Sequence, residues 1–384
     1  MSMYRYFPTN YVWSLSVSIA MNCGGQIGEI DQISAPLTEI AKNGDDAGTE
    51  KLFQSWVNFA DTLVVRAEQE VAQHHPLSAG ALYDRASVYY LVAERMQRRD
   101  YEPRQEAYRK SVAASKLAIE HNGEPAEYVE IPYEGKSFPA IFCTPGGDAP
   151  DGGWPVMVFC NGLDSMKEML YRLGLPAELA RRGIATLCVD QPGTGASLRE
   201  RDLPAIHDSE RWAGAAVDYL ETRSDVDPKR IGMSGISLGG YYAPRAAAFE
   251  KRFKLCAVWG ANYNWGELQK RRLLREGENP VPHYWDHVQW VFGKDSLDEF
   301  MDFAPKMSLE GVVEEITVPF LVTHGEDDRQ IPMDLATPEY ERAINSPDRH
   351  WKLFSSAEGG SSHAGADNES VPANYIADWV ADRL

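Results

Sequence analysis

The sequence has few positive charges relative to negative ones, and it has no long hydrophobic run. Its 384 residues include 38 Lys and Arg against 57 Asp and Glu, which gives a formal net charge of -19 at pH 7. This charge disfavours nucleic acids, anionic membranes and polyanionic substrates, and no basic patch offsets it. No window approaches the roughly 18 apolar residues of a membrane span. We therefore expect a cytoplasmic protein with a small-molecule partner, and neither nucleic acid nor membrane as a partner.

Cysteine is also scarce, and metal-binding patterns are absent. The five cysteines form no C-x-x-C pair and no Cys/His cluster, so we expect no metal. Four cysteines lie in apolar runs that we expect to be buried strands with inert thiols: Cys143, Cys160, Cys188 and Cys256. Cys160 would be reactive only beside positive charge. His283 and His287 have the i, i+4 spacing of metal ligands, but no third ligand is evident.

The N-terminal segment is too polar for a signal peptide. Residues 11–21 are moderately apolar and follow Arg5, but three serines interrupt them and no small-x-small cleavage site follows. We interpret this segment as a helix of a cap.

The character of the sequence changes near residue 125. Before that point lie helix-prone segments without a strand pattern, at 36–43, 48–73, 77–98 and 101–121. After it, short apolar runs alternate with helical ones, which predicts an α/β fold with a mostly parallel sheet flanked by helices. The turn-rich step at 122–125 marks the boundary. We predict a helical N-terminal cap over residues 1–124 and an α/β domain over 125–384.

The segment 235–239 reads Gly-Ile-Ser-Leu-Gly and matches the pattern G-x-S-x-G. A strand-like run at 230–233 precedes it and a helix-forming run at 240–249 follows it. In that context the glycines permit a sharp turn that exposes Ser237 at the helix N-terminus, as in a nucleophile elbow. The pentapeptide alone is a weak signal, because Gly-Ser runs are common in loops.

A candidate for the acid of a catalytic triad follows the serine in the sequence. The apolar run at 319–323 leads into a loop that matches the pattern H-G-x-x-D-x-x-[VI]-P. Asp328 occupies the acid position of this pattern, and Asp327 and Glu326 are the alternatives. By itself Asp328 could equally be a turn residue.

A histidine completes the order. The run at 351–354 precedes a Gly/Ser-rich loop that contains His363, which on its own could be a solvated loop residue. A serine hydroxyl is a poor nucleophile until an imidazole accepts its proton, and a carboxylate orients that imidazole. Ser237, Asp328 and His363, in this order and each after its own strand, predict a catalytic triad.

Two further loops agree with this interpretation. A buried strand at 155–160 runs into Asn-Gly-Leu-Asp-Ser, and we assign the N–H of Leu163 and the N–H of Leu238 to an oxyanion hole. The loop at 190–197 follows the apolar run at 184–189. Its glycines and proline predict a structural role, a tight turn near the pocket.

Together with Lys167-Glu168 and Trp259-Gly260, these motifs resemble the α/β-hydrolases. Within that superfamily they resemble the branch of 2,6-dihydroxypseudooxynicotine hydrolase and the fungal hydrolases that shorten heptaketides in pigment pathways. The resemblance covers about residues 125–384 and, more loosely, the helical part. It implies a cofactor-free serine hydrolase that cleaves a carbon-carbon bond beside a ketone in a phenolic or polyketide substrate. It also implies a cap that shapes the substrate site, and a homodimer.

The chain departs from this branch at Asn161, where relatives often have glycine, and at Ile236, where others have a larger polar residue. Both departures bear on the substrate and leave the triad intact. Carbon-carbon cleavage also requires a proton for the leaving carbon, which His363 can supply with or without an auxiliary acid. The candidate acids, each of which could instead be an ordinary surface carboxylate, are Asp164, Glu168 and Glu267.

A helical insertion is expected at about 262–307, before the strand that carries the acid. It is rich in aromatic residues, which either pack together or stack on a flat substrate. We take Trp259, Tyr263 and Trp265 as candidate substrate contacts.

Rival hypotheses keep the fold and change the reaction. One is a carboxylesterase or lactonase that acts on small esters, and another is a biosynthetic polyketide cyclase or acyltransferase. A catalytically silent binding protein is disfavoured because all three triad positions are filled. Replacing Ser237 by alanine distinguishes them, because a cyclase that only folds its substrate would keep much of its activity.

Overall fold

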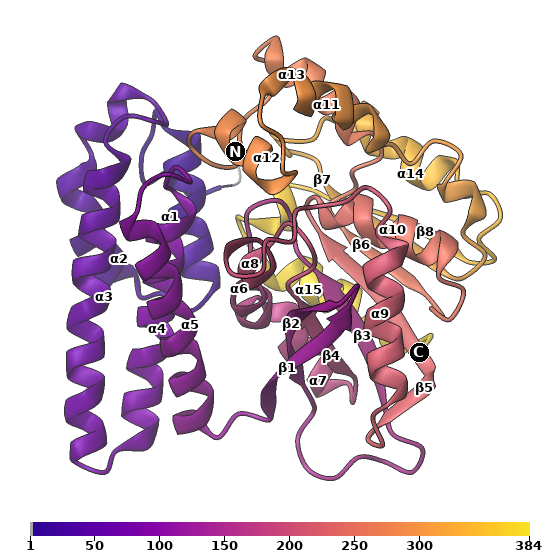
Figure 1. Cartoon of the computed structure of the whole chain (residues 1–384), viewed down its shortest axis with the longest axis horizontal. Coiled ribbons are helices and arrows are strands. Elements are labelled where there is room, and N and C mark those ends of the chain that lie inside the picture. Colours follow the sequence, from indigo (N-terminus) through magenta and orange to yellow (C-terminus); the bar gives the residue numbers. More distant parts are fainter. Residues whose placement is uncertain (1–2) are drawn as a thin grey trace. The chain divides into compact units, whose positions relative to one another are not determined.

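The computed structural model describes residues 3–384, which divide into two compact units. The helical unit contains Met3–Ala126 and the short segment Asn279–His287. The sheet unit contains Glu127–Glu278 and Val288–Leu384. In Figure 1 the helices of the first part of the chain are indigo to purple, and the sheet unit runs from magenta to yellow.

The helical unit is built around three long helices that lie side by side in Figure 1. Its helices are α1 (Tyr11–Asn22), α2 (Ile27–Ser34), α3 (Thr49–Ala72), α4 (Pro76–Arg95) and α5 (Pro103–Asn122). Helix α4 packs against both α3 and α5 and is therefore buried over most of its length. Prolines in the first turns of α4 and α5 suit positions whose N–H needs no partner within the helix. Gly123, with φ of 62°, ends α5 in the left-handed region.

The helix expected at 36–43 is instead a pair of short 3-10 helices, Ala35–Leu37 and Ile40–Asn43. Pro36 lies in the first turn of the former, and Gly44, with φ of 97°, follows the latter. The eight-residue stretch is therefore too short and too interrupted for a full α-helix.

The sheet unit contains one sheet of eight strands in the order β1-β2-β4-β3-β5-β6-β7-β8. The strands are β1 (Ala126–Tyr133), β2 (Lys136–Cys143), β3 (Trp154–Cys160), β4 (Ala185–Val189), β5 (Val226–Ile236), β6 (Cys256–Trp259), β7 (Phe320–Gly325) and β8 (Arg349–Phe354). Strand β2 is antiparallel to β4, and the run from β4 to β8 is parallel. The mostly parallel sheet predicted from the sequence is thus confirmed.

The register of the parallel strands brings their carboxyl ends together. Cys160 pairs with Gly235, Ile236 with Trp259, and Trp259 with Thr323. The loops that follow β3, β5, β6, β7 and β8 therefore start from the same edge of the sheet. In open α/β sheets this is the edge where ligands bind.

Helices pack on the sheet, and three further α-helices occur in the sequence between β6 and β7. Their bounds are α6 (Lys167–Arg172), α7 (Gly174–Arg181), α8 (Gly195–Arg199), α9 (Glu210–Glu221), α10 (Gly239–Phe249), α11 (Trp265–Leu273), α12 (Tyr284–Val291), α13 (Leu297–Phe303), α14 (Thr337–Glu341) and α15 (Ser370–Ala381). Helix α10 packs on β5 and β6 beside α9, and α15 packs on β6 and β7 beside α7. Helices α11, α12 and α13 lie between β6 and β7, so a helical insertion precedes the strand that leads to Asp328.

Part of this insertion belongs to the helical unit. We call the segment Asn279–His287 the strap. Arg95 donates to the carbonyl of Pro280 at 3.1 Å, and the backbone N–H of His283 donates to Asp46 at 2.7 Å. Within the described part of the chain, residues 3–384, every helix is too short or too polar to cross a membrane.

Candidate active site

Ser237 lies in a strained turn between β5 and α10. Its φ is 57°, in the left-handed region that side-chain-bearing residues rarely adopt. The neighbouring glycines are required sterically, since a Cβ on Gly235 would lie 2.2 Å from the carbonyl oxygen of Gly239 and a Cβ on Gly240 would lie 2.1 Å from that of Gly260. The N–H of Ser237 donates to the carbonyl of Trp259 at 2.9 Å. This is the sharp strand-to-helix turn expected from the sequence.

The structure brings Ser237, His363 and Asp328 into one hydrogen-bonded chain. Nε2 of His363 lies 2.8 Å from Oγ of Ser237, and Nδ1 of His363 lies 2.7 Å from Oδ2 of Asp328. Because a carboxylate only accepts hydrogen bonds, Nδ1 carries the imidazole proton. Nε2 is then free to accept the proton of the serine hydroxyl, which is the arrangement that general-base activation requires.

The Asp328 carboxylate is almost fully buried, with an exposed side-chain fraction of 1%. Burial raises the pKa of this group, but the charge and hydrogen bond of His363 and the N–H of Ile331 together lower it to about 2. Its second oxygen accepts from the N–H groups of Gln330 and Ile331 at 2.8 and 3.0 Å. Asp328 is therefore ionised and fixed in position at neutral pH.

The two alternative acids, Asp327 and Glu326, accept hydrogen bonds from serine residues. Asp327 accepts from the hydroxyls of Ser361 and Ser356, and Glu326 accepts from the N–H of Ser356 at 2.8 Å. Both carboxylates thus tie the loop after β7 to the loop that carries His363. Among the three neighbouring acids, Asp328 is the one that contacts the imidazole.

Asp367 organises the histidine loop and was not singled out from the sequence. Its carboxylate accepts from the N–H groups of Gly360, Ser361 and Ser362 at 2.8, 3.2 and 2.8 Å. These residues immediately precede His363. The only signal in the sequence is an aspartate four residues after the histidine, in a loop with many N–H groups to satisfy.

The loop after β3 runs directly beside Ser237. A Cβ on Gly162 would lie 3.0 Å from Cβ of Ser237 and 3.4 Å from its Oγ. Leu163 is the next residue and is 5% exposed, and Leu238 follows the serine and is 2% exposed. Leu163 thus follows a residue that lies against Ser237, and Leu238 follows Ser237 itself.

Asp190 joins the start of α6 to its own loop, in agreement with the structural role predicted for that loop. One oxygen accepts from the N–H of Lys167 at 2.6 Å, and the other from the N–H of Ala196 at 2.9 Å and from Nζ of Lys167 at 3.0 Å. A Cβ on Gly195 would lie 2.0 Å from this carboxylate. Glycine at 195 is thus needed for Asp190 to reach these partners.

The candidate auxiliary acids occupy three different environments. Glu168 is 2% exposed and forms an ion pair with Lys167 at 2.8 Å; burial raises its pKa above the usual range. Glu267 is 39% exposed and forms ion pairs with Lys270 and Arg271, as a surface carboxylate does. Asp164 is half-buried and adjoins Leu163.

The candidate aromatic contacts are mostly packing residues. Trp259 is 1% exposed and lies beneath the turn of Ser237. The ring of Trp265 lies 5.1 and 5.7 Å from those of Phe292 and Phe300, in the core of the insertion. The hydroxyl of Tyr263 contacts Arg342 at 2.5 Å.

The cysteines expected in core strands are buried, as predicted. Cys160 precedes the loop beside Ser237, and burial raises the pKa of its thiol. The thiol is therefore protonated at neutral pH.

Two known protein families match the part of the chain that contains this site. The model of the FrsA-like esterases matches residues 53–265, more than half of the chain. The chain belongs to the FrsA-like esterase family. The prolyl oligopeptidase family matches residues 213–377, which contain all three members of the hydrogen-bonded chain. The protein is an α/β-hydrolase.

Individual relatives of this family are similar over most of the chain. The 2,6-dihydropseudooxynicotine hydrolase of Paenarthrobacter nicotinovorans is 28% identical over 86% of this chain and 84% of its own. The 20-hydroxy-prefusarin hydrolase of Gibberella moniliformis is 26% identical over 93% of this chain and 92% of its own. The crystal structure of 2,6-dihydroxy-pseudo-oxynicotine hydrolase superposes with a TM-score of 0.77 at 25% identity, covering 96% of this chain and 95% of that one. The resemblance inferred from the motifs is thus confirmed.

Proposed function

We propose that this hydrolase cleaves a carbon-carbon bond beside a ketone in a hydroxylated aromatic or polyketide substrate, with Ser237 as the nucleophile. The observation that carries the proposal is the unbroken chain from Ser237 through His363 to Asp328 at the strained turn. The names of the two relatives, which act on an oxynicotine derivative and on a prefusarin, support the substrate class.

The proposed reaction begins when Oγ of Ser237 adds to the ketone carbon and its proton passes to Nε2 of His363. The N–H groups of Leu163 and Leu238 stabilise the resulting oxyanion. Collapse breaks the carbon-carbon bond, and its electron pair leaves as an enolate. His363 returns the proton to the leaving carbon, and water then hydrolyses the acyl-enzyme.

All three candidate acids have interaction partners, and Asp164 is proposed as the one that assists because of its position in the chain. Glu168 is enclosed with Lys167 and Asp190, and Glu267 is engaged with surface cations. Asp164 is partly accessible and lies next to a proposed oxyanion donor.

The test compares the protein with Ser237→Ala on an aryl 1,3-diketone and on p-nitrophenyl acetate, with products identified by mass spectrometry. We expect the diketone to be split into an acid and a ketone, and the variant to lose about 10⁴-fold or more in kcat, as losses of a triad serine do. Turnover of the ester alone would instead indicate a carboxylesterase. Diketone cleavage that persists in the variant would exclude Ser237 as the nucleophile.

A further inference from the structure

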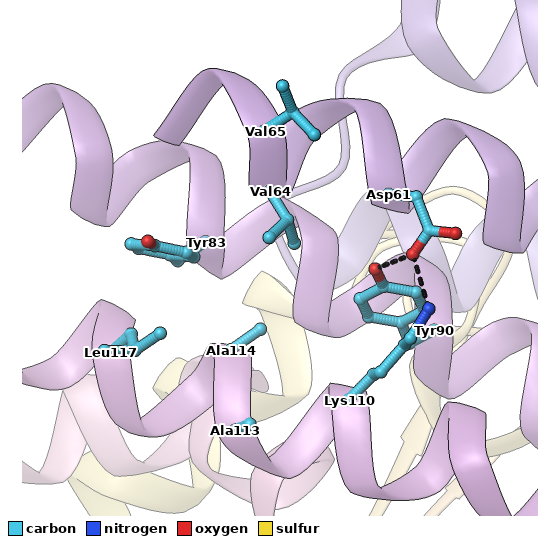
Figure 2. A pocket seen from close by; sticks show the side chains of 9 residues that line it. All are labelled: Asp61, Val64, Val65, Tyr83, Tyr90, Lys110, Ala113, Ala114 and Leu117. Atoms are coloured by element: carbon cyan, nitrogen blue, oxygen red, sulfur yellow. Dashed lines mark hydrogen bonds and ion pairs between the residues drawn. The ribbon is translucent and has the colours of Figure 1, made fainter. Parts of the chain in front are cut away.

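A groove with a volume of about 330 Å³ lies among α3, α4 and α5 of the helical unit (Figure 2). This volume falls within the roughly 300 to 1,000 Å³ typical of small-molecule sites. The apolar part of its lining consists of Val64, Val65, Ala113, Ala114 and Leu117. The two alanines leave room on α5 that larger side chains would fill.

A polar group lies at one end of the groove. One oxygen of Asp61 accepts from Nζ of Lys110 at 2.8 Å and also from the hydroxyl of Tyr90. Both dashed bonds in Figure 2 reach that same oxygen, and the other oxygen points away from Tyr90 and Lys110. The Asp61 side chain is 44% exposed, and its second oxygen is directed away from the other labelled lining residues, so Asp61 anchors Tyr90 and Lys110 at this end of the groove.

A second polar atom lies farther along the groove. Tyr83 is 5% exposed, and its ring stacks on His121 with 5.7 Å between centroids. Within residues 3–384 its hydroxyl has no hydrogen-bond partner, and its oxygen is not sealed from solvent, so a bound ligand can reach it. Burial and the charge of Glu68 raise the pKa of Tyr83, so the hydroxyl keeps its proton and can donate.

We propose that the groove binds a hydroxylated aromatic compound of one or two rings. The flat ring lies over Ala113 and Ala114, and its hydroxyl oxygen accepts a hydrogen bond from the hydroxyl of Tyr83. The apolar lining and the unpartnered Tyr83 hydroxyl match a small phenol. The site contains none of the triad residues and does not depend on the proposed function.

The test is a fluorescence titration of 2-naphthol into the full chain. We expect saturable binding at one site that Ala113→Phe abolishes, because position 113 is exposed and a phenyl ring there fills the groove without disturbing the core. Tyr83→Phe removes only the hydroxyl and is expected to weaken binding about 5-fold, as the loss of one hydrogen bond does. Naphthalene, which lacks the hydroxyl, should bind more weakly than 2-naphthol.

Lys116→Ala, an exposed change on the same helix, is the matched control and should bind like the unaltered protein. The proposal is overturned if no saturable binding occurs, or if Ala113→Phe binds 2-naphthol as well as the control does. A shift in oligomeric state with Val65→Asp, without ligand binding, would assign the groove to a second copy of the chain instead.

An independent observation concerns the loop after β3. The side-chain amide of Gln191 accepts from the N–H of Asn161 at 3.1 Å and donates to the carbonyl of Asn161 at 2.9 Å. Both residues are 0% exposed. The ladder between β3 and β4 ends where Cys160 pairs with Val189, so the Gln191 amide supplies the two bonds that a longer ladder would make.

We infer that Gln191 is a positioning residue for the oxyanion donor, an inference that rests on the proposed function. By fixing the backbone of Asn161, its amide fixes Gly162 and Leu163 beside Ser237. Replacing Gln191 by methionine keeps the length and apolar volume of the side chain and removes both hydrogen bonds. We expect this change to move the Leu163 N–H without removing any group that contacts the substrate.

The test measures the rate at which a fluorophosphonate labels Ser237. We expect Gln191→Met to slow labelling about 10- to 100-fold, by analogy with loss of one oxyanion donor, while KM for the hydrolysed substrate changes little. Gln191→Glu keeps the acceptor and loses the donor, and should lie between Gln191→Met and the unaltered protein. Gln69→Glu, an exposed change on α3, should label at the normal rate.

A folded Gln191→Met protein that labels normally would overturn the inference. If Gln191→Met does not fold, normal labelling of Gln191→Glu would overturn it in the same way. Absence of labelling in the unaltered protein would instead contradict the proposed role of Ser237, so the two failures are distinguishable.

Discussion

Among single residues, Ser237 combines an unfavourable backbone conformation with tight support. A left-handed conformation costs a side-chain-bearing residue roughly 1–2 kcal/mol, so its surroundings must impose it. The Trp259 carbonyl accepts the serine N–H, and the backbone at Gly239 and Gly260 leaves no room for a Cβ on Gly235 or Gly240. The strain is thus held by backbone atoms of β5, of β6 with the residue after it, and of α10.

Replacing Asp328 by asparagine tests the assigned acid. The carboxamide can turn its N–H₂ toward Nδ1 of His363 and favour the wrong imidazole tautomer, so we expect kcat to fall about 10⁴-fold. Steady-state kinetics on the substrate found for the unaltered protein will measure the loss. Because the pKa of Asp328 is about 2, its protonation should not limit activity above about pH 4.

The matched control for this change is Asp327→Asn, one residue away. Asp327 accepts hydrogen bonds from the hydroxyls of Ser361 and Ser356, so its loss should reduce kcat less than about 10-fold. An equal loss at both positions would argue against Asp328 as the orienting acid.

The site residues that could be predicted from the sequence are those that belong to short, recognisable motifs. Ser237, Asp328 and His363 each follow a strand at a recognisable spacing, and the structure places them in contact. Gln191 and Asp367 were not predicted because their roles depend on which backbone groups lie opposite them, and no motif records that. Glu168 could not be distinguished from a surface acid, because burial comes from the surrounding fold.

At the scale of elements, the long periodic segments were predicted best. The segments expected at 48–73 and 101–121 correspond to α3 and α5 within two residues at each end. The hairpin of β1 and β2 was not predicted as a unit. Its turn is Glu134-Gly135, with φ of 47° and 77°, and Glu-Gly is not among the usual hairpin pairs such as Asn-Gly.

The contact between α7 and α15 should make stability depend on pH through Glu369. Burial raises the pKa of this carboxyl to about 8, and the N–H of Gly174 lowers it only in part. The folded state therefore binds a proton that the unfolded chain releases above its ordinary pKa of about 4.5. Stability should fall as the pH rises from about 4.5 to about 8, and stay low above that.

Glu369→Gln imitates the protonated acid and removes this titration. We expect the variant to exceed the unaltered protein in unfolding free energy by up to about 5 kcal/mol at pH 9 and to match it near pH 5, because a shift from 4.5 to about 8 corresponds to roughly 1.4 kcal/mol per pKa unit. Urea unfolding across this pH range is the measurement. Glu341→Gln, at an exposed position, should show no such difference, and identical pH dependence in all three proteins would rule out this role for Glu369.

At the scale of the whole molecule, the chain crosses between its two compact units three times. It leaves the helical unit after Ala126, returns to it at Asn279 and leaves it again after His287. The sequence predicted a helical part and an α/β part, but it assigned the strap to the insertion of the latter. Nothing in nine residues of local sequence records that their hydrogen-bond partners, Arg95 and Asp46, lie far earlier in the chain.

Removing the N-terminal helices should therefore expose the strap. A shortened chain of residues 127–384 lacks Arg95, Asp46 and Thr49, which bind Pro280 and His283. We expect limited proteolysis to cut this chain within residues 273–287 at least 10-fold faster than the full chain, because cleavage follows local opening. Equal cutting rates would show that the strap holds its conformation without these helices.

The strap also constrains how such proteins can be recombined. The helical unit is completed by the strap, which lies far beyond Ala126 in the sequence. Residues 3–126 alone are therefore not an independent module that can be exchanged between proteins. If two members of the family exchanged only residues 3–126, Arg95 and Asp46 would be separated from their partners in the strap. Chimaeras should therefore take residues 3–126 and 279–287 from the same parent.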